Sequence, residues 1–284
     1  MAITFQPLPL AEWQETRDTL ADYARFVRRI RQYNTPQQKH YWHVSLRPTT
    51  TGLTTTPIRA ADGTIYELEF DLSHHVLLVK TSQGDVREVP LYGQSPRAFK
   101  EETLAALVDL GINPEYDEDE FNEDRPGVYD KTAVSAFWDS LIEIDTALKE
   151  FRYSHIEETS PVQFWPHHFD LGVVWFSGRK VPDQDPNDPE NANEQMNFGF
   201  STGDGAIPEA YFYATAYPAP DDWIKSELPE GAYWHSEGWS GAVLPYQRLV
   251  ESENGRRLLL NFLHAAHRAG AKRMNDPLPA EAAV

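Results

Sequence analysis

The sequence predicts an α+β protein made of two units, each with a helix, an antiparallel meander and a second helix. Three observations carry this prediction. Apolar residues recur at helical spacing in the segments 11–33 and 132–153. Between the helices lie short segments in which apolar and polar residues alternate, and turns containing Asp-Gly or Gly-Asp separate them. Moving the first half along the chain by 125 residues places it on the second half without a gap from Trp13 to Leu46.

The first helix is expected over residues 11–33, and it ends before Pro36. Four arginines lie mostly off its apolar stripe: Arg25, Arg28, Arg29 and Arg31. They are near the C-terminal end, where positive charge suits the helix dipole. We interpret them as a solvated basic face, although Arg28 and Arg29 could reach an anion.

Alternation predicts strands at residues 41–46, 65–70 and 75–80. Ser95 and Pro96 are suited to the N-cap and first position of a helix that Gly111 closes. The acidic stretch 113–130 is expected to be a linker with little structure of its own.

In the second half, a helix is expected at residues 132–153 and strands at 163–175, 196–201 and 210–217. A last helix from about 253 to 269 has Ser252 as a candidate N-cap and Gly270 as its stop. We interpret His264 and His267, near its C-terminal end, as cations favoured by the helix dipole.

The shift of 125 residues also aligns less common residues. Trp13 falls on Trp138, Gln38 on Gln163 and His43 on His168. We therefore predict an internal duplication, with a first repeat at 1–112, an acidic linker at 113–130, a second repeat at 131–270 and a flexible tail at 271–284.

The aromatic run 163–175 is the main candidate site, because it places two histidines and an aspartate at the start of an expected strand. Side chains alternate along a strand, so His168 and Asp170 would share one face, and His167 would share the other with Phe169. A His-x-Asp pair can ligate a metal or form a carboxylate-oriented general base. The alternative is that Asp170 only satisfies a half-buried His168.

The duplication extends this site to His43, on the equivalent strand face. Two histidines and one carboxylate suit zinc or ferrous iron, so His43, His168 and Asp170 are the candidate catalytic and metal-binding residues. The candidate ligand-binding residues are Arg47, Ser45, His167 and Tyr213. In the alternative arrangement, each histidine sits in its own sheet and the two never meet.

Several short motifs resemble those of a bacterial family known as domain of unknown function 5996. They are Trp13, Gly52-Leu53-Thr54-Thr55, Ser160-Pro161-Val162, His168-Phe169-Asp170-Leu171, Phe176-Ser177-Gly178 and Leu244-Pro245-Tyr246. The resemblance covers about residues 8–270. It implies no activity, cofactor or catalytic residue.

Composition narrows the function classes. The chain has no cysteine, so disulfides, thiolate metal sites and a cysteine nucleophile are excluded. A net charge of −19 argues against nucleic-acid and anionic-membrane partners, and no apolar run approaches the length of a membrane span. We expect a soluble cytoplasmic protein that is either a metal-dependent enzyme or a non-catalytic protein binding a small molecule or a protein partner.

Overall fold

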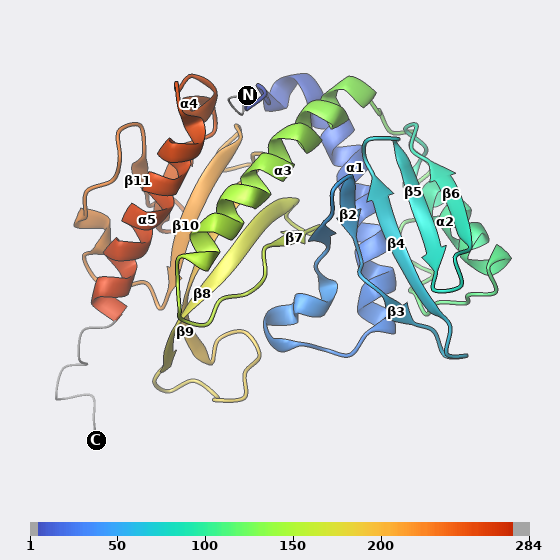
Figure 1. Cartoon of the computed structure of the whole chain (residues 1–284), viewed down its shortest axis with the longest axis horizontal. Helices are drawn as coiled ribbons and strands as arrows, with labels where there is room; N and C mark the ends of the chain where they lie inside the picture. Colours follow the sequence, from blue (N-terminus) through green and yellow to red (C-terminus); the bar gives the residue numbers. More distant parts are fainter. Residues whose placement is uncertain (1–4, 275–284) are drawn as a thin grey trace. The chain divides into compact units, whose positions relative to one another are not determined.

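The computed structural model describes residues 5–274, and its helices and two antiparallel sheets confirm the α+β class (Figure 1). The chain forms two compact units. The N-terminal unit comprises residues 5–145 and 162–171, and the C-terminal unit comprises residues 146–161 and 172–274. Both units include part of helix α3 (Lys131–Tyr153), which extends the helix expected from the sequence by one residue. The internal duplication stays a prediction.

The sheet of the N-terminal unit has the strand order β1-β2-β4-β5-β6, with β3 paired to β4. Its strands are β1 (Arg47–Pro48), β2 (Gly52–Thr54), β3 (Ile58–Arg59), β4 (Ile65–Asp71), β5 (Val76–Thr81) and β6 (Val86–Pro90). Strands β4 and β5 confirm the two strands expected at 65–70 and 75–80. Alternation predicts them well because their two faces differ in burial.

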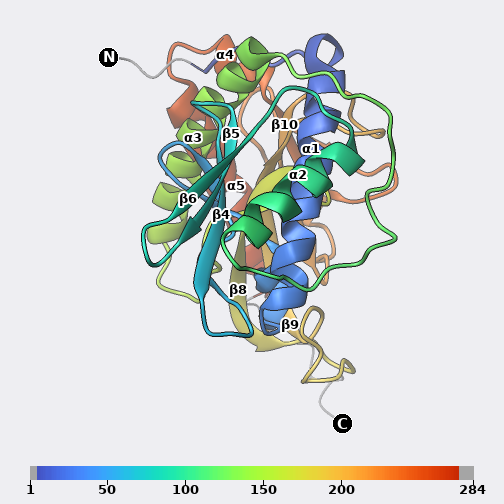
Figure 2. The same cartoon turned by 90° about the vertical axis from the view of Figure 1, so that its right-hand side faces the viewer.

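Two helices cover this sheet, α1 (Leu10–Asn34) and α2 (Pro96–Asp109), and Figure 2 shows them beside each other. The Ser95 hydroxyl accepts a hydrogen bond from the Ala98 amide at 3.2 Å, as expected of an N-cap. Phe99 is fully buried and joins the layers, since its ring stacks on Tyr23 of α1 at 4.1 Å and faces Phe70 of β4 at 6.3 Å.

The prediction of a strand at residues 41–46 is wrong. Residues Lys39–Val44 form the 3₁₀ helix η1, in which His40 and Tyr41 have φ of 50° and 54°. Left-handed residues break the two-residue alternation of a strand. Extended pairing begins only at Leu46, which exchanges hydrogen bonds of 2.8 and 2.9 Å with Phe164 of strand β7 (Gln163–Trp165).

The acidic segment 113–130 has no helix or strand, as expected, but it is attached along its length to α1 and α2. Asn34 exchanges hydrogen bonds with the Glu115 backbone at 2.8 and 3.0 Å. The Lys100 ammonium donates to the Glu118 and Glu120 carbonyls at 3.2 and 2.9 Å. The segment therefore forms a wall over the two helices.

In the C-terminal unit the strand order is β11-β12-β10-β9-β8. The strands are β8 (Asp170–Lys180), β9 (Asn193–Ser201), β10 (Tyr211–Tyr217), β11 (Tyr233–His235) and β12 (Gly241–Pro245). The short helix η2 (Trp223–Lys225) lies between β10 and β11, and α4 (Gln247–Val250) joins β12 to α5 (Gly255–Met274), which packs on β9 and β10.

The predicted ends of the last helix are wrong. Asn254 caps α5 in place of Ser252, because its side-chain oxygen accepts from the Arg257 amide at 3.0 Å. Gly270 lies inside the helix, where an added Cβ would be 2.5 Å from the Met196 sulfur on β9. The glycine thus permits close packing of α5 on the sheet. The predicted tail beyond residue 274 lies outside the described residues. Within residues 5–274, no helix combines the length and hydrophobicity needed to span a bilayer.

Candidate functional site

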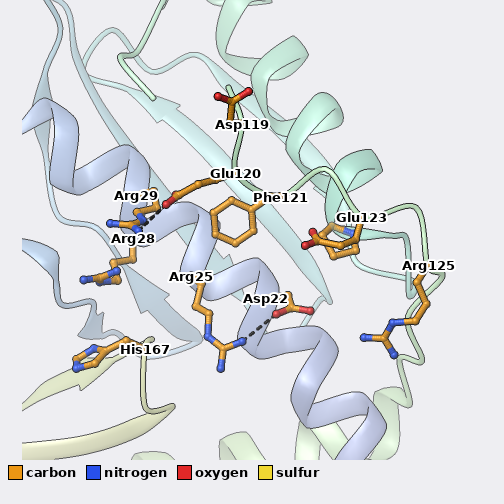
Figure 3. Close-up of a pocket in the computed structure, with 11 residues that line it drawn as sticks. Asp22, Arg25, Arg28, Arg29, Asp119, Glu120, Phe121, Glu123, Arg125 and His167 are labelled. Carbon is orange, nitrogen blue, oxygen red and sulfur yellow. Dashed lines mark hydrogen bonds and ion pairs between the residues drawn. The ribbon is translucent and has the colours of Figure 1, made fainter. Parts of the chain in front are cut away.

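A cavity of about 460 Å³ lies in the N-terminal unit beside α1 (Figure 3). Its walls come from α1, the start of α2, the acidic segment and the turn that follows β7. The lining residues are Asp22, Arg25, Arg28, Arg29, Pro96, Asp119, Glu120, Phe121, Glu123, Arg125 and His167. This is a polar site, with four arginines, four carboxylates and a histidine around one phenylalanine ring.

The arginines of α1 reach the cavity because positions three, four and seven apart share a helix face. Two of them are neutralised within the wall. Arg25 pairs with Asp22 at 2.9 Å, and Arg29 pairs with Glu120 at 2.6 Å, as the dashed lines in Figure 3 mark. These pairs fix the side of the cavity without leaving a free charge.

Arg28 differs from its neighbours. Its Nε atom is buried and has no hydrogen-bond partner among residues 5–274. Desolvation lowers the pKa of Arg28 first and the charge of Arg29 lowers it further, while Glu120 opposes the shift. A half-buried guanidinium with an unused donor is costly unless a further group satisfies it.

His167 enters the cavity from a turn and not from a strand. The amides of His168 and Phe169 both donate to the Trp165 carbonyl, at 3.2 and 2.8 Å, and Phe169 has φ of 55°. The buried Phe169 ring anchors the turn against Phe137 at 5.4 Å. The histidines before it therefore stay at the surface.

The predicted alternation of faces is wrong here for the same reason. His167 and His168 are both exposed, with ring centroids 4.1 Å apart, whereas Asp170 is buried as the first residue of β8. His167 does not lie in the core with Phe169. Desolvation at the cavity wall, followed by the charges of His168, Arg28 and Arg25, lowers the pKa of His167 to about 4.

His43 is buried in η1, where its Nδ1 atom accepts a hydrogen bond from the Gln38 amide at 3.2 Å. Desolvation lowers the pKa of His43, and the charges of Arg31 and Arg28 lower it further. Both histidines are thus in the field of Arg28, one from η1 and one from the turn after β7.

Ser45 and Arg47 have structural partners. The buried Ser45 hydroxyl donates to Gln163 at 2.6 Å, and Arg47 donates to the Val162 carbonyl at 3.4 Å. These bonds attach Ser45 and the start of β1 to residues 162–163 at the start of β7. Tyr213 belongs to the C-terminal unit, where it packs against the apolar cluster of Ile207, Tyr211 and Val243.

No group of three or more His, Cys, Asp or Glu side chains within residues 5–274 is arranged to hold a metal ion. His43, His168 and Asp170 therefore do not form the predicted three-ligand cluster. They come from η1, an exposed turn position and a buried strand end.

The arginines of α1 were interpreted from the sequence as a solvated face, and the burial of Arg31 was therefore missed. Only 5% of its surface is exposed, and its Nε and Nη1 atoms have no hydrogen-bond partner in the described chain. Its remaining nitrogen lies 3.5 Å from the Thr56 hydroxyl. Desolvation, and then Arg47, lower the pKa of Arg31 to about 10. Four arginines within seven residues of one helix, in an acidic chain, are the sequence signal for this region.

A second histidine cluster lies in the C-terminal unit. The His155 ring centroid is 4.2 Å from that of His267 and 6.0 Å from that of His264. Trp175 and Phe151 pack edge-on against His267 at 4.7 and 6.2 Å. The predicted role of His264 and His267 as helix-end cations is wrong, since burial lowers the pKa of both.

Comparison with known proteins gives a family but no activity. The sequence pattern described as "Family of unknown function (DUF5996)" matches residues 5–279. No curated protein and no solved structure matches the chain significantly.

Proposed function

Because the chain belongs to the DUF5996 family of unknown function, its role has to be inferred from its own residues, and we propose that it is a non-catalytic protein that binds a small molecule. The binding site is the cavity beside α1. The observation that carries this proposal is Arg28, whose buried Nε has no hydrogen-bond partner among residues 5–274, whereas the other two α1 arginines of the wall are ion-paired. Concave sites with a few convergent polar groups are the usual places for small ligands.

The arrangement supports binding better than metal-dependent catalysis. Metal chemistry needs a preorganised set of ligands, and His43, His168 and Asp170 do not form one. The cavity walls, by contrast, are already held by ion pairs and by the hydrogen bonds that attach the acidic segment to α2. The protein's acidity, with a net charge of −19, further supports a small-molecule partner over nucleic acid or an anionic membrane.

A thermal-shift screen with a blocked variant tests this function. A ligand present at a hundred times its Kd should stabilise the wild-type protein by about 2.7 kcal/mol, which raises Tm by several degrees. His167→Trp should remove that shift, because an indole at this position occupies the cavity without disturbing buried contacts. Mass spectrometry should recover the ligand unchanged after incubation.

His168→Trp is the matched control. His168 is equally exposed and adjacent, but it does not line the cavity. Its Tm shift should equal that of the wild type. Ligand shifts that persist in His167→Trp would place binding elsewhere, and conversion of the ligand would favour an enzyme.

A further inference from the structure

We propose that the ligand of this cavity carries a compact oxyanion, of the carboxylate or phosphate type, that forms charge-assisted hydrogen bonds with Arg28. The inference rests on the proposed function and specifies the chemistry of its ligand. A guanidinium presents planar donors that match such groups. Figure 3 shows the Arg28 side chain between Arg29 and the His167 turn.

The first step is the comparison of the three α1 arginines in the wall. Arg25 and Arg29 each have a carboxylate partner, at 2.9 and 2.6 Å. Arg28 has a buried and unused Nε donor. Two of these three guanidiniums are thus ion-paired, whereas Arg28 has no ion pair within residues 5–274 and only the nearby charge of Glu120 opposes its own.

The second step is the positive potential around Arg28. Arg31, three residues along α1, is buried with two unused nitrogens. The charge of Arg28 acts on His43 and on His167, and in both it disfavours the protonated ring. His43 in η1 and His167 in the turn after β7 are therefore both close enough to Arg28 to feel its charge, which a bound anion would offset.

The third step is the position of the carboxylates. Asp22 and Glu120 are each paired with an arginine, although the second carboxylate oxygen of Glu120 is buried without a hydrogen-bond partner in the described chain. Asp119 and Glu123 are exposed, so water screens their charge. Among the lining residues that the structure describes, Arg28 is therefore the half-buried charged group without an ion-pair partner.

Isothermal titration with sodium sulfate and sodium phosphate at low ionic strength tests this inference. Sulfate keeps its charge at all pH values near neutrality. We expect both anions to bind the wild type, with sodium chloride at equal ionic strength producing no comparable heat. Arg28→Gln should weaken binding at least tenfold. Arg28→Lys should restore part of it, because the ammonium keeps the charge but not the planar donors.

Arg59→Gln is the matched control, since Arg59 is an exposed arginine of the same unit outside the cavity. Its affinity should equal that of the wild type. The Tm of Arg28→Gln without ligand should be unchanged or higher, because a poorly satisfied charge is removed; a large fall would assign Arg28 a structural role and overturn the inference.

The failures of the two proposals are distinguishable. If ligands from the screen bind in the cavity but sulfate and phosphate do not, the oxyanion inference is wrong and the binding function stands. If Glu123→Gln abolishes binding and Arg28→Gln preserves it, the ligand is cationic. If nothing binds in the cavity, both proposals fail.

Discussion

Replacing Phe99 with alanine is expected to lower the free energy of unfolding by about 3–5 kcal/mol, the usual cost of truncating a buried phenylalanine. Phe99 is fully buried, and its ring contacts α1 and β4 through Tyr23 and Phe70. The partners are too large to collapse into the space, so a cavity would remain. Denaturation in urea, followed by circular dichroism, measures the change.

The same substitution should weaken ligand binding, because Phe99 holds α2 against α1 and both helices line the cavity. Val108→Ala is the control on the same helix, since Val108 is 56% exposed. It should cost less than about 0.5 kcal/mol. A similar loss in both variants would show that α2 is not anchored through Phe99.

The helices and the longer strands could be predicted from the sequence, since their periodicity follows from burial of one face. α1 buries Trp13, Tyr23 and Ile30, and the first four residues of β4 and of β5 alternate between half-buried and buried. Ser95 and Gly111 were identified by local chemistry, and Gly111 has φ of 75°. In each case, the residues that determine the element are close in the sequence.

The site could not be predicted in the same way. His40, Tyr41 and Phe169 adopt left-handed conformations that no turn residue signals. For this reason, strands were wrongly predicted from the sequence for the segments that contain the candidate histidines. Gly270 was interpreted as the end of the last helix, because the residue it packs against, Met196, is far away in the sequence. Arg28 and Arg31 lie off the apolar stripe; Arg28 lines the cavity that the acidic segment helps to close, and Arg31 is buried beside Thr56. These features depend on tertiary contacts.

The C-terminal unit is expected to lose stability as the pH falls from about 6.5 toward 4, because three histidines share an aromatic core. Desolvation and the proximity of His155 lower the pKa of His267 to about 4, and Glu157 only partly opposes this. Burial lowers the pKa of His155 and of His264 as well. The Nε2 atoms of His155 and His267 are buried without hydrogen-bond partners in the described chain. Protonation of either ring therefore places a charge in the core.

The direction follows from proton linkage. The unfolded chain binds a proton at His267 near pH 6.5, and the folded chain does so only near pH 4. The stabilisation is thus complete above pH 6.5, falls between these values and is absent below them. For His267 alone the loss is about 3 kcal/mol.

The charged groups that face the three rings are Glu150, Glu157 and Arg268. Both carboxylates favour protonation of the rings and Arg268 opposes it, but desolvation is the largest cause in each case.

Replacing His267 with leucine keeps an apolar side chain against Trp175 and Phe151 and removes the titrating group. Urea denaturation at pH 7, 6, 5 and 4.5 should show a similar free energy of unfolding at pH 7 and a shallower loss at acid pH. His235→Leu, a histidine of the same unit on β11, should retain the wild-type slope. An unchanged slope in His267→Leu would show that the acid sensitivity arises elsewhere, because the buried ring is the one group that this substitution prevents from taking up a proton.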